Sequence, residues 1–326
     1  MRYEIKSRFI KAWRESSPKA FKIALWMIKL TVIVSFAVEL MRYFGIIRWM
    51  SESLSPIFQL IGLPGEASLA FLTGYFVNVY GAIAVIGTLT LTVRETTILG
   101  IMVLCAHNML IETAVQQKTG SSLVRMFILR TLGALLGGFI AHLLMPAETT
   151  SITHETVQTA SMTLQTIAIN WLLSTLWLTV RMFVFIIALS YMQRLLSEFG
   201  VITLLSKFLR PFLKIFGLPA KTSFLWIVAN VLGLAYGAAV MLEETQEGKI
   251  DRRDADLLNH HIAVSHSNFE DLLLMVAFGA SIGWLLLVRL ALAFVYVWER
   301  RLESKMHLYM SSLFSIFVAI LLIMTN

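Results

Sequence analysis

Long apolar segments separated by short polar stretches dominate the sequence, and they lack two-residue alternation of apolar and polar positions. This pattern predicts helices rather than the strands of a membrane barrel. The predicted order is a long apolar helix, an amphipathic elbow ending in Gly-Leu-Pro, an apolar segment interrupted by Gly and Asn, and two more helices. These elements are predicted at 22–46, 49–64, 66–92, 97–117 and 121–145, and again at 160–195, 203–219, 221–244, 255–275 and 279–298.

Single residues also recur in the same order in the two stretches, which indicates an internal repeat. His107 aligns with His266, Gly120 with Gly279, Ser122 with Ser281 and Arg130 with Arg289. The chain is therefore divided into a basic tail, a first repeat, a linker, a second repeat and an extra C-terminal helix predicted at 304–325. The boundaries of these five parts are 1–21, 22–145, 146–159, 160–299 and 300–326.

Composition places these helices in a lipid bilayer. Of the 326 residues, 57% are hydrophobic and 14% are charged, and the mean hydropathy is +0.75. Soluble chains carry about 45–50% apolar and about 25% charged residues, so a soluble enzyme or a disordered regulator is excluded. The single cysteine, Cys105, excludes an intrachain disulfide. The net charge of +7 fits cytoplasmic loops of a membrane protein, so a nucleic-acid partner is not expected.

The placement of charge predicts inverted topology. Residues 146–158 contain two glutamates and no Lys or Arg, which is typical of an extracytoplasmic loop, whereas the N-terminal tail is rich in both. The first repeat must then cross the membrane an odd number of times, which requires its interrupted segment to be a re-entrant hairpin. The prediction is an all-α, multi-pass inner-membrane protein with a cytoplasmic N-terminus, an extracytoplasmic C-terminus and two inverted repeats.

The residues Glu112–Arg130 resemble the Gate motif of the nucleoside-recognition family. This family includes the membrane part of ferrous-iron transporter B, spore maturation proteins A and B, and concentrative nucleoside transporters. The sequence Lys-Thr-Gly-Ser at 118–121 looks most like the ferrous-iron transporter, and residues 62–78 look like its first hairpin. The resemblance implies a membrane transporter or permease, and together with the prevalence of two-fold assemblies it favours a homodimer.

Two departures weaken the inference of iron transport. The chain contains no Gly-x-x-x-x-Gly-Lys-Ser/Thr phosphate loop, so it lacks the signature of a GTPase domain. The Gate cysteine of the iron transporters aligns with Asn108, and Cys105 lies about one turn earlier. The name of the family does not by itself establish a nucleoside substrate.

Polar side chains at membrane depth are the candidate site, because an ionisable group there costs about 2.5–3.5 kcal/mol on insertion scales. Candidate metal ligands are His107, Glu112, His266 and Glu270, with the last two spaced as neighbours on one helical face. The other candidates for substrate binding are Asn78, Asn108, Ser122, Asn230, Asn268, Asp271 and Ser281. Proton coupling and hydrogen bonding to a nucleoside remain open for the same residues. Packing between helices and helix capping are the structural alternatives.

The sequence therefore predicts a transporter that moves a small polar solute or a divalent metal ion by alternating access between the repeats. A nucleoside-like substrate is one alternative, and a non-transporting membrane component that contacts a partner protein or a lipid intermediate is another. An enzyme is not expected, because the chain has neither His-Glu-x-x-His nor Gly-x-Ser-x-Gly. No resident cofactor is predicted beyond a divalent ion as substrate or ligand.

Overall fold

The computed structural model describes residues 2–147 and 164–324, which fold into helices without any strand. The first half of the described chain contains the helices α1 (Arg2–Tyr43), α2 (Ile46–Leu60), α3 (Ala67–Phe76), α4 (Val79–Ile86), α5 (Val93–Ala106), α6 (Met109–Lys118) and α7 (Leu123–Leu144). The second half contains α8 (Leu164–Glu198), α9 (Val201–Ile215), the 3-10 turn η2 (Ala220–Thr222), α10 (Ser223–Val231), α11 (Leu234–Gln246), α12 (Arg252–Ile262), α13 (Asp271–Ala277) and α14 (Ile282–Met324). The protein is thus an all-α membrane protein, as predicted.

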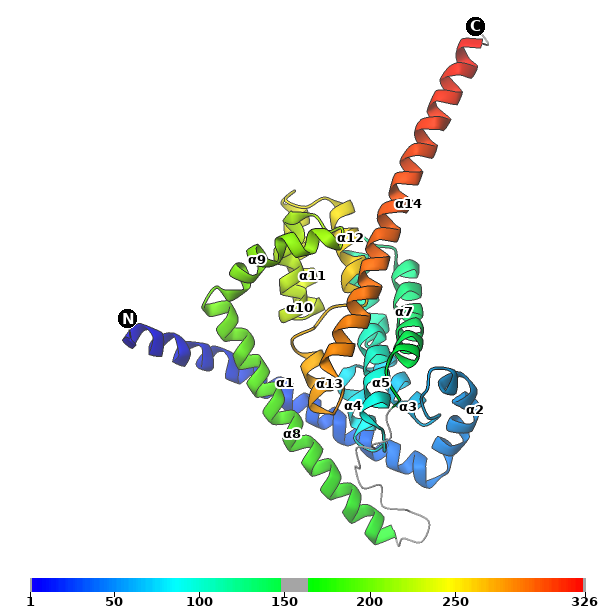
Figure 1. The fold of residues 1–326 in the computed structure, drawn as a ribbon. Coiled ribbons are helices and arrows are strands. Elements are labelled where there is room, and N and C mark those ends of the chain that lie inside the picture. Colours follow the sequence, from blue (N-terminus) through cyan, green and yellow to red (C-terminus); the bar gives the residue numbers. More distant parts are fainter. Residues whose placement is uncertain (1, 148–163, 325–326) are drawn as a thin grey trace.

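Corresponding helices of the two halves pack antiparallel. Phe21 of α1 stacks edge-on against Phe183 of α8, with ring centroids 5.9 Å apart, and farther along α1 Phe36 meets Trp171 nearer the start of α8. The helices α7 and α14 also run in opposite directions in Figure 1. This antiparallel packing is the arrangement that inverted repeats require.

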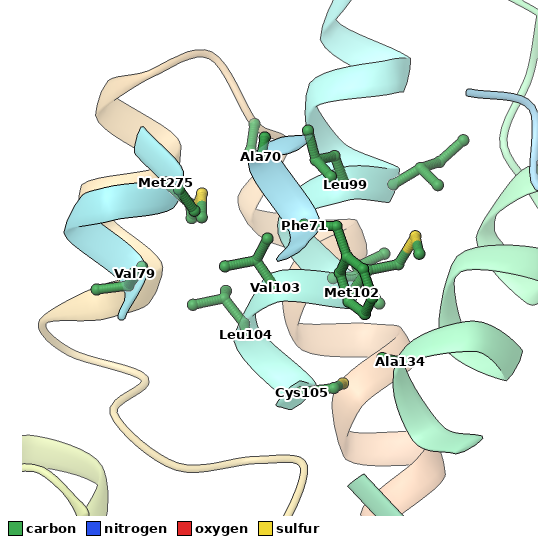
Figure 2. Close-up of a cluster of buried hydrophobic side chains, with 14 of the residues drawn as sticks. Ala70, Phe71, Val79, Leu99, Met102, Val103, Leu104, Cys105, Ala134 and Met275 are labelled. Carbon is green, nitrogen blue, oxygen red and sulfur yellow. The ribbon is translucent and has the colours of Figure 1, made fainter. Parts of the chain in front are cut away.

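Small residues allow α7 to approach its neighbours closely. A Cβ atom on Gly133 would lie 2.7 Å from Val264 Cγ1, and one on Gly138 would lie 2.8 Å from Met102 Cγ. Figure 2 shows part of the apolar cluster that forms there, with Met102, Cys105 and Ala134 among its labelled side chains. Glycine contacts of this kind are common between membrane helices, where close backbone packing replaces the hydrophobic effect as the driving force.

Two predicted helices are each broken in the structure. The segment predicted as 97–117 is divided into α5 and α6, which are bent by 42° at residues 107–108. The segment predicted as 255–275 is divided into α12 and α13, and residues 263–270 between them are not helical. The predicted helical pairing of His266 with Glu270 is therefore wrong, because no helix brings those residues onto one face.

The ends of the chain also differ from the prediction. The basic tail 1–21 is helical from Arg2 and continuous with the first apolar helix. The helices predicted at 279–298 and 304–325 are one continuous helix, α14, so residues 299–303 between them, including Arg300 and Arg301, are helical as well. Most of the predicted linker, including Glu148 and Glu155, lies outside the described residues.

Within the described residues, two helical stretches are long and apolar enough to cross a membrane. These are Leu123–Leu144 in α7 and Ile282–Met306 in α14, and α5 together with α6 makes a third if the bent pair is one span. The broken helices pack against these two helices, since α5 contacts both α7 and α14 and α12 contacts α14. Their breaks leave backbone polar groups that need partners.

Candidate metal centre

The two breaks have matching backbone geometry. Asn108 and Ser267 are the residues other than glycine with positive φ in the described chain, at 48° and 49°. Each follows a histidine directly, and each donates its backbone N–H to a carbonyl of the neighbouring hairpin. The acceptors are Gly74 for Asn108, at 2.9 Å, and Ala229 for Ser267, at 3.2 Å. Equivalent positions of the two halves thus bend the chain in the same way.

Two fully buried arginines bind the carbonyl groups at these breaks. The guanidinium of Arg130 donates to the carbonyl of Cys105 at 3.2 Å and to that of His107 at 2.6 Å. Arg289 makes the same pair of bonds in the second half, to Val264 at 2.8 Å and to His266 at 2.6 Å. Backbone carbonyls released by a broken helix must find donors inside a membrane, and these arginines supply them.

The imidazoles of the two histidines face each other between the halves, with ring centroids 5.1 Å apart. Nδ1 of His107 lies 3.2 Å from the Val103 carbonyl, and Nδ1 of His266 lies 2.7 Å from the Ile262 carbonyl. Because a carbonyl oxygen only accepts, each Nδ1 carries the proton and donates it. In the neutral ring each Nε2 is then a lone pair directed into the space between the histidines.

Carboxylates approach these two nitrogens. Glu112 bridges the rings: its Oε1 lies 3.2 Å from His107 Nε2, and its Oε2 lies 3.2 Å from His266 Nε2. Asp271 Oδ2 lies 3.3 Å from His107 Nε2. The fully buried His266 Nε2 has no hydrogen-bond partner among the described residues, because its lone pair and the nearby carboxylate oxygen are both acceptors. One ligand atom each from His107, His266 and Asp271 lies within 4.8 Å of the others.

Comparison with known proteins identifies the domain that builds this centre. Residues 24–141 match the family Gate, described as nucleoside recognition. The chain is a membrane protein that resembles Gate-domain proteins over this region. It is 28% identical over 281 residues to the "Uncharacterized membrane protein YvoD" of Bacillus subtilis (strain 168), which covers 82% of this chain and 88% of that relative. No solved structure matches the chain. The resemblance drawn from Glu112–Arg130 is thereby confirmed.

The Gate-domain match lies in the first half, but the centre takes ligands from both halves. Glu112 comes from α6 and Asp271 from the start of α13, at corresponding positions of the two repeats. Glu112 is also held by Arg130, with Nη2 2.6 Å from Oε2. The sequence analysis assigned both histidines and both carboxylates to the site. It identified Arg130 and Arg289 as repeat partners but did not assign them to the site. Their recurrence at matching positions was the signal for them.

Glu270 is a neighbour of the centre rather than a member of its cluster. Its Oε1 accepts a hydrogen bond of 2.7 Å from the hydroxyl of Tyr80, a residue of α4 that sequence reasoning did not assign to the site. The Tyr-Gly-Ala sequence shared by the two repeats marked this tyrosine only as a repeated residue. The carboxylate beside His107 is that of Asp271 instead, because the break before α13 changes which side chain faces the histidines.

Three of the four asparagines predicted to bind substrate form hydrogen bonds with other groups of the protein instead. Asn268 donates to Asn230 Oδ1 at 2.6 Å and accepts from Arg289 Nη1 at 2.7 Å, and Asn230 in turn donates to the Trp226 carbonyl. Asn78 caps α4 through its Oδ1, which accepts the Gly81 N–H at 2.9 Å. The structure therefore supports the packing and capping readings for these side chains.

The two serines have different surroundings. Ser122 caps α7, with its Oγ accepting the Arg125 N–H at 3.4 Å. Ser281 is held through its backbone N–H, which donates to Thr97 Oγ1 at 2.8 Å. Neither contact reaches the histidines, so the structure does not bring these two predicted residues to the centre.

A chain of buried polar contacts joins α6 to α12 beside the centre. Gln116 lies one turn after Glu112 and donates to the Asn259 carbonyl at 3.2 Å. Asn259 donates to Ser121 Oγ at 3.0 Å, and Ser121 donates to Asp256 Oδ1 at 2.6 Å. Arg300 of α14 completes the chain with a bond of 2.6 Å to Asp256 Oδ2. This polar chain thus runs from α6 of the first half through α12 to Arg300, between the centre and the protein surface.

Proposed function

We propose that this protein moves a divalent transition-metal ion across the inner membrane, with His107, His266, Asp271 and Glu112 as the ion's ligands. The observation that carries the proposal is the convergence of three buried ligand atoms within 4.8 Å, at the point where two broken helices meet. Transporter sites are typically built from broken helices at the junction of two repeats. The ion is the substrate here, and no catalytic step is part of the role.

The chemistry of the donors supports a cation. Each histidine presents a lone pair on Nε2, because its Nδ1 proton is held by a backbone carbonyl. Carboxylate oxygens are acceptors as well, so lone pairs face lone pairs across 3.2–3.3 Å. A positive charge between them, either a metal ion or protons on the rings, makes such an arrangement favourable. Imidazole with carboxylate suits Fe²⁺, Mn²⁺ or Zn²⁺.

The position of the ligands supports passage rather than permanent retention. Glu112 belongs to the first half and Asp271 to the second, and the pairs α1–α8 and α7–α14 pack antiparallel between the halves. A movement of one half against the other would separate the carboxylates and open the centre, which is the step that alternating access requires. In this proposal the basic N-terminus is cytoplasmic.

The alternatives have less support in the contacts. The amide side chains of Asn230 and Asn268 could hydrogen-bond a nucleoside, but they already bond to each other. Asn230 also donates to the Trp226 carbonyl, and Asn268 accepts from Arg289. A nucleoside would have to replace those bonds. A non-transporting membrane component that binds metal, or that serves a partner protein, could have the same metal centre. It would differ from a transporter only in that no metal ion crosses the membrane.

The test is metal uptake by the full chain reconstituted in liposomes, with Mn²⁺ and Zn²⁺ offered separately. His107→Asn and His266→Asn are the informative variants, because an asparagine amide can still donate to the carbonyl that Nδ1 binds but has no atom at the Nε2 position. His261→Asn is the matched control: this buried histidine accepts from the Trp226 indole at 3.1 Å and is not part of the cluster.

We expect uptake of at least one of the two ions, reduced at least about tenfold in each of the first two variants and retained in the control. Uptake of nucleosides without metal would favour the alternative substrate. Metal binding without flux would assign the protein to the non-transporting class. Equal uptake in all four proteins would contradict the proposed ligands.

A further inference from the structure

A second candidate site lies away from the metal centre, in a cavity of about 340 Å³. Residues of α12, α14 and the turn between α6 and α7 surround it. Its lining includes Gly120, Arg252, Arg253, Asp256, Arg300 and Ser304. The volume is within the range of about 300–1,000 Å³ that is typical of small-molecule sites. Neither the metal centre nor the family match accounts for three arginines at one cavity.

The charges at this cavity do not cancel. Its acidic lining residue, Asp256, has both oxygens occupied, one by the Ser121 hydroxyl and the other by Arg300 Nε, each at 2.6 Å. Arg300 also pairs with Glu303, at 2.9 Å, and Arg125 binds Glu303 at 2.7 Å. The carboxylates near the cavity are therefore engaged, and neither Arg252 nor Arg253 has an ion-pair partner among the described residues.

Arg252 and Arg253, which have no ion-pair partner, are available to a ligand. Arg253 bonds only to an uncharged partner, with its Nη2 donating to Ser304 Oγ at 3.2 Å. The Arg252 side chain makes no hydrogen bond or ion pair with any residue that the structure describes. A guanidinium presents its N–H donors in a planar fork that matches the oxygens of a phosphate group.

The turn that closes the cavity is specific to this half. Gly120 has a φ of 111°, which residues with a side chain rarely adopt, and it lies directly before Ser121. The corresponding turn at Gly279 packs against α5 through the Ser281 N–H and has no charged residue between 274 and 282. Only one of the two equivalent turns thus borders a cluster of arginines in the described chain.

We propose that this cavity binds a phosphate-bearing molecule through Arg252 and Arg253. A phosphate group carries the charge that two unpaired guanidinium groups attract, and the cavity has room for a further part of the molecule beyond the phosphate. The same chemistry is present in an anionic phospholipid headgroup and in a small soluble phosphate ester. A divalent cation is disfavoured here by the arginines, so this site is independent of the metal centre.

The test uses the full chain in a neutral detergent and in lipid nanodiscs. The soluble probe is glycerol 3-phosphate, measured by thermal shift at constant ionic strength. The lipid probe is a phosphatidylcholine nanodisc with and without phosphatidylglycerol. The variant is the double change Arg252→Gln and Arg253→Gln, and the control is Lys207→Gln with Arg210→Gln on α9, which removes the same charge from exposed positions outside the cavity.

We expect at least one probe to stabilise the wild-type chain, with affinity at least about tenfold lower in the cavity variant and unchanged in the control. Stabilisation by glycerol 3-phosphate assigns a soluble ester, and stabilisation by phosphatidylglycerol alone assigns a headgroup. No response to either probe, or an equal loss in the control, overturns the proposal. If the double variant does not fold, Arg252→Gln alone decides, because that side chain holds no other residue.

Discussion

The two helices that lead to the metal centre, α5 and α12, differ in character although they occupy equivalent places. Where α5 has Gly100 and Met102, α12 has Asn259 and His261, and all four are buried. In the first half this approach is packed with apolar side chains, as in the cluster of Figure 2. Beside α12, in contrast, lies the polar chain from Gln116 of α6 to Arg300 of α14.

The two halves share the residues at their breaks but differ in the helices that lead to them. Each half has a histidine, a residue with positive φ and a buried arginine at its break, and the bonds of the two arginines are equivalent. The approach helices are not under that requirement.

The largest effect is expected from removing the arginine that holds a carboxylate. Arg130→Ala leaves two carbonyls and Glu112 without their donor, and breaking a buried ion pair costs about 3–5 kcal/mol. Arg289→Ala leaves two carbonyls and the neutral Asn268 oxygen, so its cost should be smaller. Thermal unfolding of both variants measures the difference.

A double variant isolates the reason for that difference. Adding Glu112→Gln to Arg130→Ala removes the unpaired charge and should recover part of the lost stability. If Arg130→Ala and Arg289→Ala destabilise the protein equally, the charge of Glu112 does not make the first half more sensitive than the second to the loss of its arginine.

A medium effect is expected at the approach helices themselves. Asn259→Ala removes the side-chain amide that donates to Ser121 Oγ at 3.0 Å and to the Gln116 carbonyl at 3.3 Å, and buried groups left unsatisfied cost about 1–3 kcal/mol. The equivalent change, Gly100→Ala, adds a Cβ at 3.2 Å from the flexible end of Leu285, with a cost below about 1 kcal/mol. Chemical unfolding of the two variants compares the halves, and a larger loss for Gly100→Ala would contradict the account.

A smaller effect is expected at the serines that precede α7 and α14. Ser122→Ala removes an N-cap and should cost about 0.5–1 kcal/mol, at the low end because the bond is 3.4 Å long. The Ser281 hydroxyl makes no bond with the described residues, so Ser281→Ala should change stability by less than about 0.5 kcal/mol. Comparable losses would mean that both serines are caps.

The smallest effect is a pH response confined to the start of α12. Asp251 caps this helix through the Asp254 N–H, at 2.8 Å, and that bond lowers the pKa of the Asp251 carboxyl below its usual range, with a further contribution from Lys221. The carboxylate therefore stabilises the fold above the pKa of an unfolded aspartate, about 3.9, and this contribution is lost as the pH falls through the lower folded value.

The first half offers the comparison for that response. The helix α5 is capped by Thr92, whose neutral hydroxyl accepts the Glu95 N–H at 3.1 Å, while the Glu95 carboxylate accepts the Thr92 N–H at 2.8 Å. Asp251→Asn keeps a cap but removes the titrating group, so the variant should lose less stability than the wild type between pH 5 and pH 3. Thr92→Ser should leave the acid response unchanged. Identical acid unfolding of Asp251→Asn and the wild type would remove this assignment.

The order of helices and the candidate histidines could be predicted from the sequence, because apolar length and repeated motifs are local signals. The breaks could not, since Asn108 and Ser267 adopt positive φ with no proline or glycine nearby to mark a stop. That failure led directly to Glu270 as a predicted ligand. A helix through 266–270 would place it beside His266, whereas the actual break turns Asp271 toward His107.

Metal binding by the purified chain tests the central claim most directly. Titration calorimetry with Mn²⁺ or Zn²⁺ compares the wild type with His107→Asn, His266→Asn and the control His261→Asn, each confirmed as folded by thermal unfolding. The account predicts one ion per chain, held at least about tenfold more weakly by each of the first two variants and equally well by the control. A wild-type chain that binds neither ion, or first two variants that bind like the wild type, would contradict it.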